Sequence, residues 1–364
     1  MRILYDGQIY KYQAAGGITR YFANLISRLP QSFMPHLTIP PQQEIIYPVH
    51  SNLKILKYNS LRPLRLFNKF EKYYFQSIAA SKDFDIVHPT YYNSLTQQNL
   101  NRYSHPIIIT VYDMVHEIFR NKIDPKGEHI ELKRKAISTA QKIICISENT
   151  KKDLINFYSV PEEKITVTYL ASSIDASLSY GTEPVPSQPY YLYVGSRDSN
   201  YKNFDTLLLA FRKAVSVKPE IKLCIVGYPF SETEIKLIAD LNLSDRIEHY
   251  AYASDAHLAK LYRCSLAFVY PSLYEGFGIP PLEAMSCGTA VIASNSSSLP
   301  EVVADAGILF NPKSTSDLAD ILLLLLDNSA ERDRLIAKGH QRAKTFSWDK
   351  TVAQTLDVYY SVGK

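Results

Sequence analysis

Cysteine is scarce in this sequence, and no two cysteines lie close together. The 364 residues include four of them, Cys145, Cys224, Cys264 and Cys287, and none forms a Cys-x-x-Cys pair. A zinc site or a disulfide framework needs closely spaced cysteines, so neither is indicated. We therefore expect reduced thiols within apolar runs and a cytoplasmic protein.

Long apolar runs and a strong charge of one sign are also lacking. No apolar run reaches the ~18 residues that a membrane-spanning helix needs, and Met1–Asp6 shows no signal-peptide pattern. The net charge of +4 is too small to favour a nucleic-acid partner. The length and the 46% of hydrophobic residues fit two globular domains with cores of ordinary size.

An acidic metal site is not indicated either. Asp83 and Asp85 have the Asp-x-Asp spacing, but they lie at the start of the short predicted strand at 85–89 instead of following its end. Ligands of α/β sheets bind at the carboxyl ends of the strands. We therefore predict that the protein holds no metal.

Short apolar runs alternate with segments of helical periodicity along the chain. The predicted strands are 2–6, 53–58, 85–89, 107–111, 142–146, 164–168, 190–194, 223–227, 247–252 and 266–269. This alternation predicts an α/β fold with doubly wound sheets. Residues 171–189, rich in Ser and Pro, have the texture of an interdomain linker. Apart from 53–58, we expect residues 31–60 to be irregular.

The stretch Tyr270–Ala293 reads as strand, loop, short helix and strand. Gly276 and Gly278 permit open backbone angles and let N–H groups approach a ligand. Two prolines at 280 and 281 suit the first turn of a helix. The N-terminus of that helix would face an anion at the end of the sheet.

Two carboxylates frame this loop, Glu275 before it and Glu283 within the helix. Acidic side chains beside an anion are unfavourable unless they bind hydroxyl groups, and a carboxylate can accept from a pair of hydroxyls. A ligand with phosphates in the middle and hydroxyls at both ends is a nucleotide sugar. The alternative is an ordinary αβ unit in which both Glu side chains are solvated.

Two further loops carry candidate anion contacts. Arg197 and Lys202 bracket the loop after the strand at 190–194, and together they can neutralise a diphosphate. On the residues alone, surface charges explain them equally well. Gly16 and Gly17 precede a predicted helix at 18–29 and would bring N–H groups to its N-terminus, although a plain turn also explains the pair.

The run at 271–284 closely resembles the donor-site motif of the family 4 glycosyltransferases, which are retaining enzymes of the GT-B fold; it reads Pro-Ser-Leu-Tyr-Glu-Gly-Phe-Gly-Ile-Pro-Pro-Leu-Glu-Ala. The similarity covers nearly the whole chain and is weakest over 30–80. It implies two Rossmann-like domains that face each other across a cleft. The first domain, 1–175, would be completed by the C-terminal helix at 347–364, and the second, 176–346, would hold the donor.

The resemblance also implies roles for single residues. Glu275 would contact the donor sugar and Glu283 the ribose, while Arg197 and Lys202 would neutralise the diphosphate. The other implied donor contacts are Gly16, Gly17, Gly276, Phe277, Gly278 and Ile279.

The first domain departs from the family pattern at one position. Family members usually carry a His-Asp pair where this chain has Tyr112 and Asp113, and here a histidine, His116, follows three residues later. We expect Asp113 and His116 to position the sugar or the acceptor. The alternative is that Asp113 caps a helix and His116 lies on the surface.

The implied reaction moves a hexose, of glucose or mannose type, from a nucleotide sugar to a saccharide or lipid-linked acceptor in polysaccharide biosynthesis. It would proceed with retention and without a metal or a cofactor. No identified side chain contacts the base, which favours a UDP-hexose over GDP-mannose. One alternative is a non-catalytic nucleotide-sugar-binding subunit, which Tyr112 favours. Another is an epimerase or inverting transferase of the GT-B fold. The presence of all four implied donor-site side chains disfavours it; these are Arg197, Lys202, Glu275 and Glu283.

The helix predicted over 62–80 has a basic stripe opposite an aromatic one. The basic residues are Arg62, Arg65, Lys69 and Lys72, and the other stripe contains Phe67, Phe70, Tyr74 and Ile78. The helix either has a plain solvated face or docks at an anionic membrane surface or lipid-linked acceptor. Docking would make the protein peripheral at the inner face of the plasma membrane. We expect the aromatic stripe to pack on the first domain.

Overall fold

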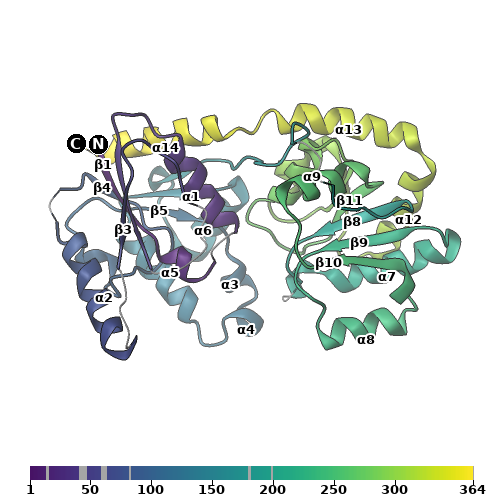
Figure 1. The fold of residues 1–364 in the computed structure, drawn as a ribbon, viewed down its shortest axis with the longest axis horizontal. Coiled ribbons are helices and arrows are strands. Elements are labelled where there is room, and N and C mark those ends of the chain that lie inside the picture. The colour runs from purple at the N-terminus through teal and green to yellow at the C-terminus, as the bar shows by residue number, and fades with distance from the viewer. Residues whose placement is uncertain are drawn as a thin grey trace. The chain divides into compact units, whose positions relative to one another are not determined.

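The chain divides into two compact units in a computed structural model (Figure 1). The structure describes residues 1–13, 16–40, 47–58, 64–81, 83–178, 182–197 and 200–363. Unit 1 contains Met1–Leu170 and Trp348–Lys364, and unit 2 contains Ala171–Ser347. Unit 1 is therefore built from two separate pieces of the sequence.

The strands of unit 1 are all parallel. They are β1 (Arg2–Asp6), β2 (Met34–Ile39), β3 (Lys54–Lys57), β4 (Ile86–Val87), β5 (Ile108–Val111), β6 (Lys142–Cys145) and β7 (Ile165–Val167). Two sheets, ordered β3-β2-β1-β4 and β5-β6-β7, are linked by a single bridge between Val87 and Ile107. The strand order reverses next to β1, as in a doubly wound Rossmann fold, which confirms the predicted fold class.

Strand β2 corrects the expectation that residues 31–60 are irregular apart from 53–58. Pro35 and His36 interrupt the apolar alternation of this segment, so the local pattern is weak. The strand nevertheless pairs with β1 on one side and β3 on the other, for example Tyr5 with Leu37. Pairing along both edges supplies the hydrogen bonds that stabilise it, and these partners cannot be seen in a local window.

The helices of unit 1 are α1 (Gly17–Ser27), α2 (Leu64–Ala79), α3 (Val115–Ile118), α4 (Arg120–Ile123), α5 (Glu128–Thr139), α6 (Glu148–Tyr158) and α14 (Trp348–Val362). Ser147 caps α6, since its hydroxyl accepts from the Thr150 N–H at 2.9 Å. Within the described ranges, no helix is both long and apolar enough to cross a membrane.

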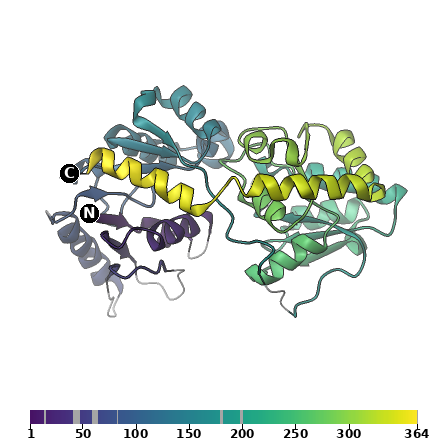
Figure 2. The same cartoon turned by 90° about the horizontal axis from the view of Figure 1, so that it is seen from above.

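The last helix, α14, packs on unit 1 against α1 and β6 (Figure 2). A buried polar network anchors it there. The Tyr359 hydroxyl lies 2.7 Å from His88 Nδ1 and 3.0 Å from the Tyr5 hydroxyl, and His88 Nε2 lies 2.9 Å from the Thr110 hydroxyl. Burial lowers the pKa of His88 to about 3, so this ring is neutral in the folded protein.

Neutral His88 makes the stability of unit 1 dependent on pH. The folded state resists protonation down to a pKa of about 3, whereas the unfolded chain binds a proton near the ordinary pKa of 6.5. The contribution of neutral His88 to the free energy of unfolding is therefore complete above the pKa of the unfolded chain and is lost as the pH falls below it. The stability advantage of the wild type over His88→Phe should shrink by about 1.4 kcal/mol per pH unit between about pH 6 and about pH 4.

Urea unfolding of both proteins across this range measures the effect. Burial raises the pKa of Asp6 to about 6, which stabilises the fold on acidification, but both proteins share that contribution and it cancels in the difference. A difference that stays constant with pH would contradict the assignment of a neutral His88.

Unit 2 contains one sheet of six parallel strands. They are β8 (Tyr190–Val194), β9 (Lys222–Val226), β10 (Ile247–Tyr250), β11 (Ala267–Tyr270), β12 (Val291–Ser294) and β13 (Ile308–Phe310), in the order β10-β9-β8-β11-β12-β13. This is again the doubly wound Rossmann order. It reverses between β8 and β11, and ligands of such sheets bind at the carboxyl ends of these two strands.

The helices of unit 2 are α7 (Phe204–Val217), α8 (Glu232–Asp240), α9 (Asp255–Cys264), α10 (Ile279–Ser286), α11 (Leu299–Val303), α12 (Thr315–Asp327) and α13 (Ser329–Ala343). Helices α7 and α12 pack against each other and bury Leu207, Phe211 and Leu322 with the side chains of the sheet. This core fixes the positions from which the loops at the carboxyl edge emerge.

Candidate functional site

The loops after β8 and β11 meet where the strand order of unit 2 reverses. The Leu273 N–H donates to the Tyr201 carbonyl at 2.7 Å, so the backbones of the two loops are joined directly. Asn203 adds a second link, because its side-chain amide donates to the Pro271 carbonyl at 2.9 Å and to the Pro312 carbonyl at 2.8 Å. The predicted diphosphate and sugar residues lie on these two loops.

Lys202 and Glu275 form an ion pair across this junction. Lys202 Nζ lies 2.8 Å from Glu275 Oε1, and both side chains are mostly buried. Burial acts to lower the pKa of Lys202, but the nearby Glu275 carboxylate together with Tyr270 and Tyr201 outweighs burial and raises that pKa well above its usual value. Lys202 is therefore a permanent positive charge at the carboxyl edge, with the Tyr201 ring 4.9 Å away.

Arg197 takes a different set of partners. Its Nε donates to Glu234 Oε1 at 2.8 Å, and its guanidinium lies 4.6 Å from the Phe230 ring centre and 5.4 Å from that of Phe204. The side chain is only 2% exposed. The structure thus joins Lys202 to Glu275, while Arg197 is paired with Glu234, a residue that the sequence analysis did not single out.

The loop after β11 leads into α10 with the backbone that its glycines and prolines predict. Gly278 is the residue before the helix and has a φ of 119°, a left-handed value that side chains disfavour. A Cβ added there would also approach the Leu299 side chain to 2.9 Å. Residues 280 and 281 are prolines without an N–H, and the Leu282 N–H donates to the Gly278 carbonyl at 3.4 Å, so the start of α10 offers an anion at the carboxyl edge the N–H groups of Gly278 and Ile279.

Glu283 lies inside α10 and is largely buried. Its Oε2 accepts a hydrogen bond from the Tyr262 hydroxyl at 3.1 Å. Tyr262 belongs to α9, so the carboxylate is oriented by the neighbouring helix. Phe277 is also buried, and its ring meets that of Phe346 edge-on at 5.7 Å. Phe277 thus packs in the interior, which leaves its backbone as the group that can face a ligand.

A serine-rich loop after β12 supports the loop that carries Glu275. The Ser297 hydroxyl accepts from the Glu275 N–H at 2.8 Å, and the Ser298 hydroxyl donates to the carbonyls of Glu275 at 2.9 Å and Phe277 at 2.6 Å. Sequence reasoning missed this role. The available signal was the run of three serines at 296–298 directly after a buried strand.

The predicted residues of unit 1 lie around the carboxyl end of β5. Asp113 Oδ1 accepts from the Val115 N–H at 3.0 Å at the start of α3. The His116 ring stacks on that of His129 of α5, with 4.6 Å between centres. Burial lowers the pKa of His116. Asp113 therefore accepts from the first N–H of α3 but is not its N-cap, which is Met114 and makes no side-chain capping bond, and His116 is packed against a second imidazole.

Tyr112, at the position where the resemblance expects a histidine, is a core residue. Its side chain is buried, and its hydroxyl donates to the Thr90 carbonyl at 3.1 Å. Gly16 and Gly17 lie at the start of α1, where the Gly16 N–H donates to the Thr19 hydroxyl at 2.7 Å. The unit 1 glycines thus begin a helix, as predicted.

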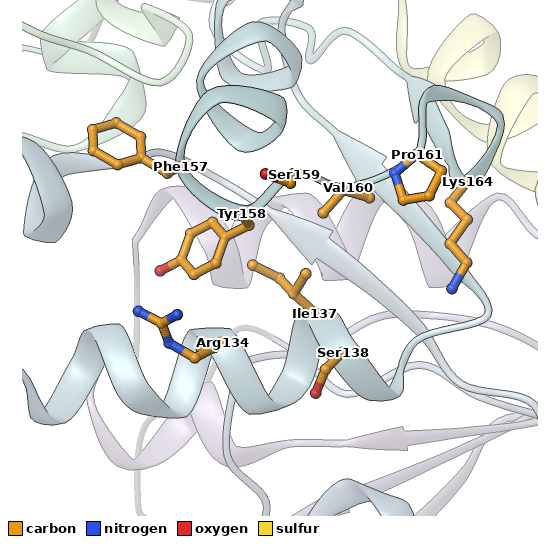
Figure 3. A pocket seen from close by; sticks show the side chains of 9 residues that line it. All are labelled: Arg134, Ile137, Ser138, Phe157, Tyr158, Ser159, Val160, Pro161 and Lys164. Atoms are coloured by element: carbon orange, nitrogen blue, oxygen red, sulfur yellow. The ribbon is translucent and has the colours of Figure 1, made fainter.

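One hollow in unit 1 includes none of the predicted site residues. It has a volume of about 380 Å³ and lies between α5 and α6, with Arg134, Tyr158 and Lys164 in its wall (Figure 3). The Arg134 guanidinium lies 5.6 Å from the Tyr158 ring centre. Among the described residues, no three His, Cys, Asp or Glu side chains are grouped so that they could hold a metal.

Comparison with known proteins is consistent across both units. Residues 182–342 match the family model of glycosyl transferases group 1, and residues 15–171 match that of glycosyltransferase family 4. O-antigen chain mannosyltransferase B of Escherichia coli is 33% identical over 62% of this chain and 61% of its own length. The MMP alpha-(1->4)-mannosyltransferase of Mycolicibacterium hassiacum is 30% identical over 76% of this chain and 70% of its own length.

A solved structure extends the similarity to the fold. Anabaena Alr3699/HepE, determined in complex with UDP and glucose, superimposes with a TM-score of 0.76 at 17% identity, over 99% of this chain and 100% of that one. This likeness concerns the fold, while the sequence matches concern the family. The chain belongs to the family 4 glycosyltransferases of the GT-B type, with a Rossmann-like sheet in each of its two units.

Proposed function

We propose that the protein transfers a hexose from a nucleotide sugar to an acceptor hydroxyl, with retention at the anomeric carbon. The observation that carries the proposal is the Lys202–Glu275 ion pair beside the N-terminus of α10, at the point where the sheet order reverses. A buried cation and the N–H groups of Gly278 and Ile279 suit a diphosphate, and an adjacent carboxylate suits sugar hydroxyls.

The proposed mechanism is one of charge stabilisation. The leaving diphosphate gains negative charge as the glycosidic bond breaks. Lys202, Arg197 and the N–H groups at the start of α10, those of Gly278 and Ile279, stabilise that charge more in the transition state than in the ground state. Glu275 orients a hydroxyl of the sugar. The leaving phosphate oxygen takes the acceptor proton on the face of attack. Asp113 and His116 position the acceptor.

Mannose is the sugar that the relatives favour. Both are named as mannosyltransferases, and we propose a saccharide or lipid-linked acceptor in polysaccharide biosynthesis, as the name O-antigen chain mannosyltransferase suggests for the first. The base is a separate question. The sequence favours UDP over GDP, and the HepE complex contains UDP, so the test includes both.

Ligand screening followed by turnover tests this function. Thermal shifts with UDP, GDP and ADP identify the base, because a ligand that binds the folded state raises its stability. UDP-glucose and GDP-mannose then serve as donors, each with and without excess chelator. Slow release of nucleoside diphosphate without acceptor supports an enzyme over a binding subunit. Loss of activity with chelator and its rescue by manganese would refute the metal-independent mechanism.

The two framing carboxylates should have separable effects. We expect Glu283→Gln to weaken binding of the bare nucleoside diphosphate, because its carboxylate would hold the ribose. Glu275→Gln should lower turnover and leave that binding nearly unchanged, because its carboxylate would contact the sugar. Calorimetry with the diphosphate and donor turnover on both variants measure the two effects. The opposite pattern would exchange the roles.

Docking of α2 at an anionic membrane surface is a further part of the proposal. Arg62 and the side chains of Arg65 and Lys69 lie outside the described part of the chain. Phe70 is 59% exposed, so it does not pack on unit 1 as expected, and Tyr73 nearby is 64% exposed. Exposed aromatic side chains beside Lys72 suit an interface between lipid and water.

Vesicle co-sedimentation measures this docking. The wild type should bind anionic vesicles at low salt and be released by salt, since each basic residue contributes about 1 kcal/mol near such a surface. A variant with glutamine at all four basic positions should not bind; these positions are Arg62, Arg65, Lys69 and Lys72. Equal binding of both proteins would assign the docking to another surface.

A further inference from the structure

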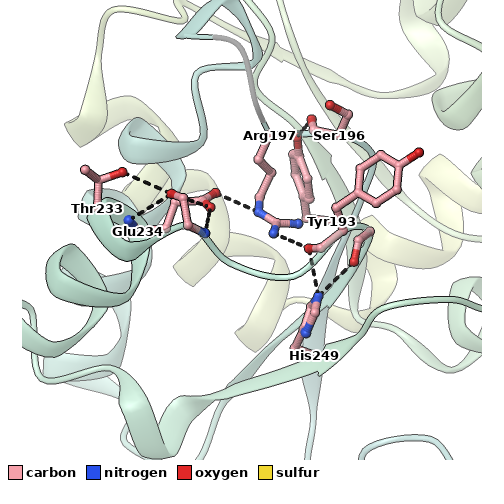
Figure 4. Close-up of polar contacts among 9 residues, drawn as sticks. Tyr193, Ser196, Arg197, Thr233, Glu234 and His249 are labelled. Carbon is pink, nitrogen blue, oxygen red and sulfur yellow. Dashed lines mark hydrogen bonds and ion pairs between the residues drawn. The ribbon is translucent and has the colours of Figure 1, made fainter.

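Arg197 is held by protein groups on nearly every side (Figure 4). Its Nε donates to Glu234 Oε1 at 2.8 Å, and its Nη2 donates to the Tyr228 carbonyl. The rings of Phe204 and Phe230 lie close to the guanidinium. Two of the three nitrogens, and the ring contacts, therefore fix the plane of this group.

The third nitrogen, Nη1, is the exception. It is buried and has no hydrogen-bond partner among the described residues. A Cβ added to Gly227 would lie 3.2 Å from Nη1, which places this nitrogen beside the carboxyl end of β9. A buried charged donor without an acceptor is unfavourable, and a phosphate oxygen is the acceptor that a guanidinium binds best.

Glu234 is itself rigidly placed. It is the third residue of α8, and its Oε2 accepts from the Ser231 N–H at 2.7 Å and the Ser231 hydroxyl at 2.9 Å in a capping box. Its other oxygen, Oε1, is the one that receives Arg197 Nε. Oε2 of Glu234 thus caps the N-terminus of α8, and Oε1 orients the Arg197 guanidinium.

The loop on the opposite side of Arg197 is fixed by His249. Its Nε2 lies 2.8 Å from the Gly227 carbonyl and 3.1 Å from the Tyr228 carbonyl. Because both partners are acceptors, Nε2 carries the proton and donates to them. The Tyr228 carbonyl therefore accepts from both His249 Nε2 and Arg197 Nη2. Of the three guanidinium nitrogens of Arg197, only Nη1 has no partner among the described residues.

We propose that Glu234 is a positioning residue of the diphosphate site, holding Arg197 so that Nη1 donates to a phosphate oxygen. This inference rests on the proposed function, since it takes the diphosphate of the donor as the ligand. Arg197 then contributes one oriented nitrogen, and Lys202 supplies a separate charge. The ion pair with Glu234 compensates the buried guanidinium without occupying the nitrogen that binds phosphate.

Calorimetry with UDP and with GDP on the full chain tests the proposal. For the nucleoside diphosphate that binds the wild type, Glu234→Ala should weaken binding about tenfold, the effect of losing one charged hydrogen bond. Glu234→Gln should restore most of the affinity, because its side-chain oxygen still accepts from Arg197 Nε. Affinity for the matching nucleoside, uridine or guanosine, should not change.

Two controls separate positioning from helix capping. Ser231→Ala removes the hydroxyl of the capping box but keeps the Glu234–Arg197 pair, so it should lower the melting temperature and leave diphosphate affinity unchanged. In an Arg197→Ala background, Glu234→Ala should have no further effect on binding, because the residue acts through Arg197.

The outcomes distinguish this proposal from the function on which it rests. Unchanged or tighter diphosphate binding by Glu234→Ala would overturn it, the tighter result meaning that Glu234 competes with phosphate for Arg197. An equal loss in the Arg197→Ala background would overturn it as well. If neither UDP nor GDP binds the wild type, the proposed function fails and this inference fails with it.

Discussion

Replacing Lys202 by methionine should lower hexosyl-transfer turnover about 100-fold or more. The substitution keeps the length of the side chain and removes the charge that lies 2.8 Å from Glu275 at the carboxyl edge. Losing a charged contact with the leaving group in a dry site costs on the order of 3 kcal/mol of transition-state stabilisation. Steady-state kinetics with the donor identified by ligand screening measure the loss. Arg197→Ala should reduce turnover by a similar order.

A matched control is a second lysine ion pair, which lies at the C-terminal end of α7, whereas Lys202 lies just before its N-terminal end. Lys218 pairs with Asp327 at 3.1 Å on a more exposed surface, far along α7 from the junction. Lys218→Met should leave turnover within about twofold, because an exposed pair contributes little. Near-normal turnover of Lys202→Met would refute the role of this lysine in stabilising the diphosphate.

The largest effect on stability is expected at the buried ion pair of unit 1. Lys133 Nζ lies 2.8 Å from Glu117 Oε2, and the two side chains are 1% and 4% exposed. Lys133 also donates to the Asp113 carbonyl at 2.9 Å. Lys133→Met leaves the Glu117 carboxylate buried without its cation, which should cost about 3–5 kcal/mol of folding free energy. Urea unfolding measures it.

Two comparisons test whether the cost arises from the unpaired charge. The double variant Lys133→Met, Glu117→Gln should recover a large part of the lost stability, because no buried charge is left. At the exposed pair of Arg334 and Glu331, the variant Glu331→Gln should cost less than about 1 kcal/mol. A loss at Lys133→Met no larger than that at Glu331→Gln would contradict the reasoning.

The fold was predictable because it depends on patterns that are local in sequence. Buried parallel strands appear as short apolar runs, and the strands β1 and β8 have the bounds that the sequence predicts. Helix starts also follow from local residues, since the hydroxyls of Ser147, Ser231 and Ser254, a residue type favoured at this position, each accept an N–H of the first turn. Strand β2 escaped detection because its stabilising partners lie on other strands.

The candidate site was predictable only in part, because its geometry depends on side-chain partners that are distant in sequence. The sequence predicted two loops at the ends of strands, one with Glu275 and the other with Lys202, and their ion pair joins positions 73 residues apart. Nothing in the local sequence links Arg197 to Glu234, or His116 to His129. Each of these contacts is made by the packing of one αβ unit on the next. The roles of these residues in binding and catalysis stay predictions.

The order in which the chain leaves the ribosome differs from the order in which the two units can be completed. Unit 2 is one continuous segment, whereas unit 1 lacks α14 until residues after unit 2 have been synthesised. Until then, Tyr5 and His88 have no Tyr359 to contact. We expect nascent chains that end before Trp348 to contain a folded unit 2 and a loosely packed unit 1, which limited proteolysis would reveal. With this connectivity, synthesis of unit 1 begins before that of unit 2 and is completed after it.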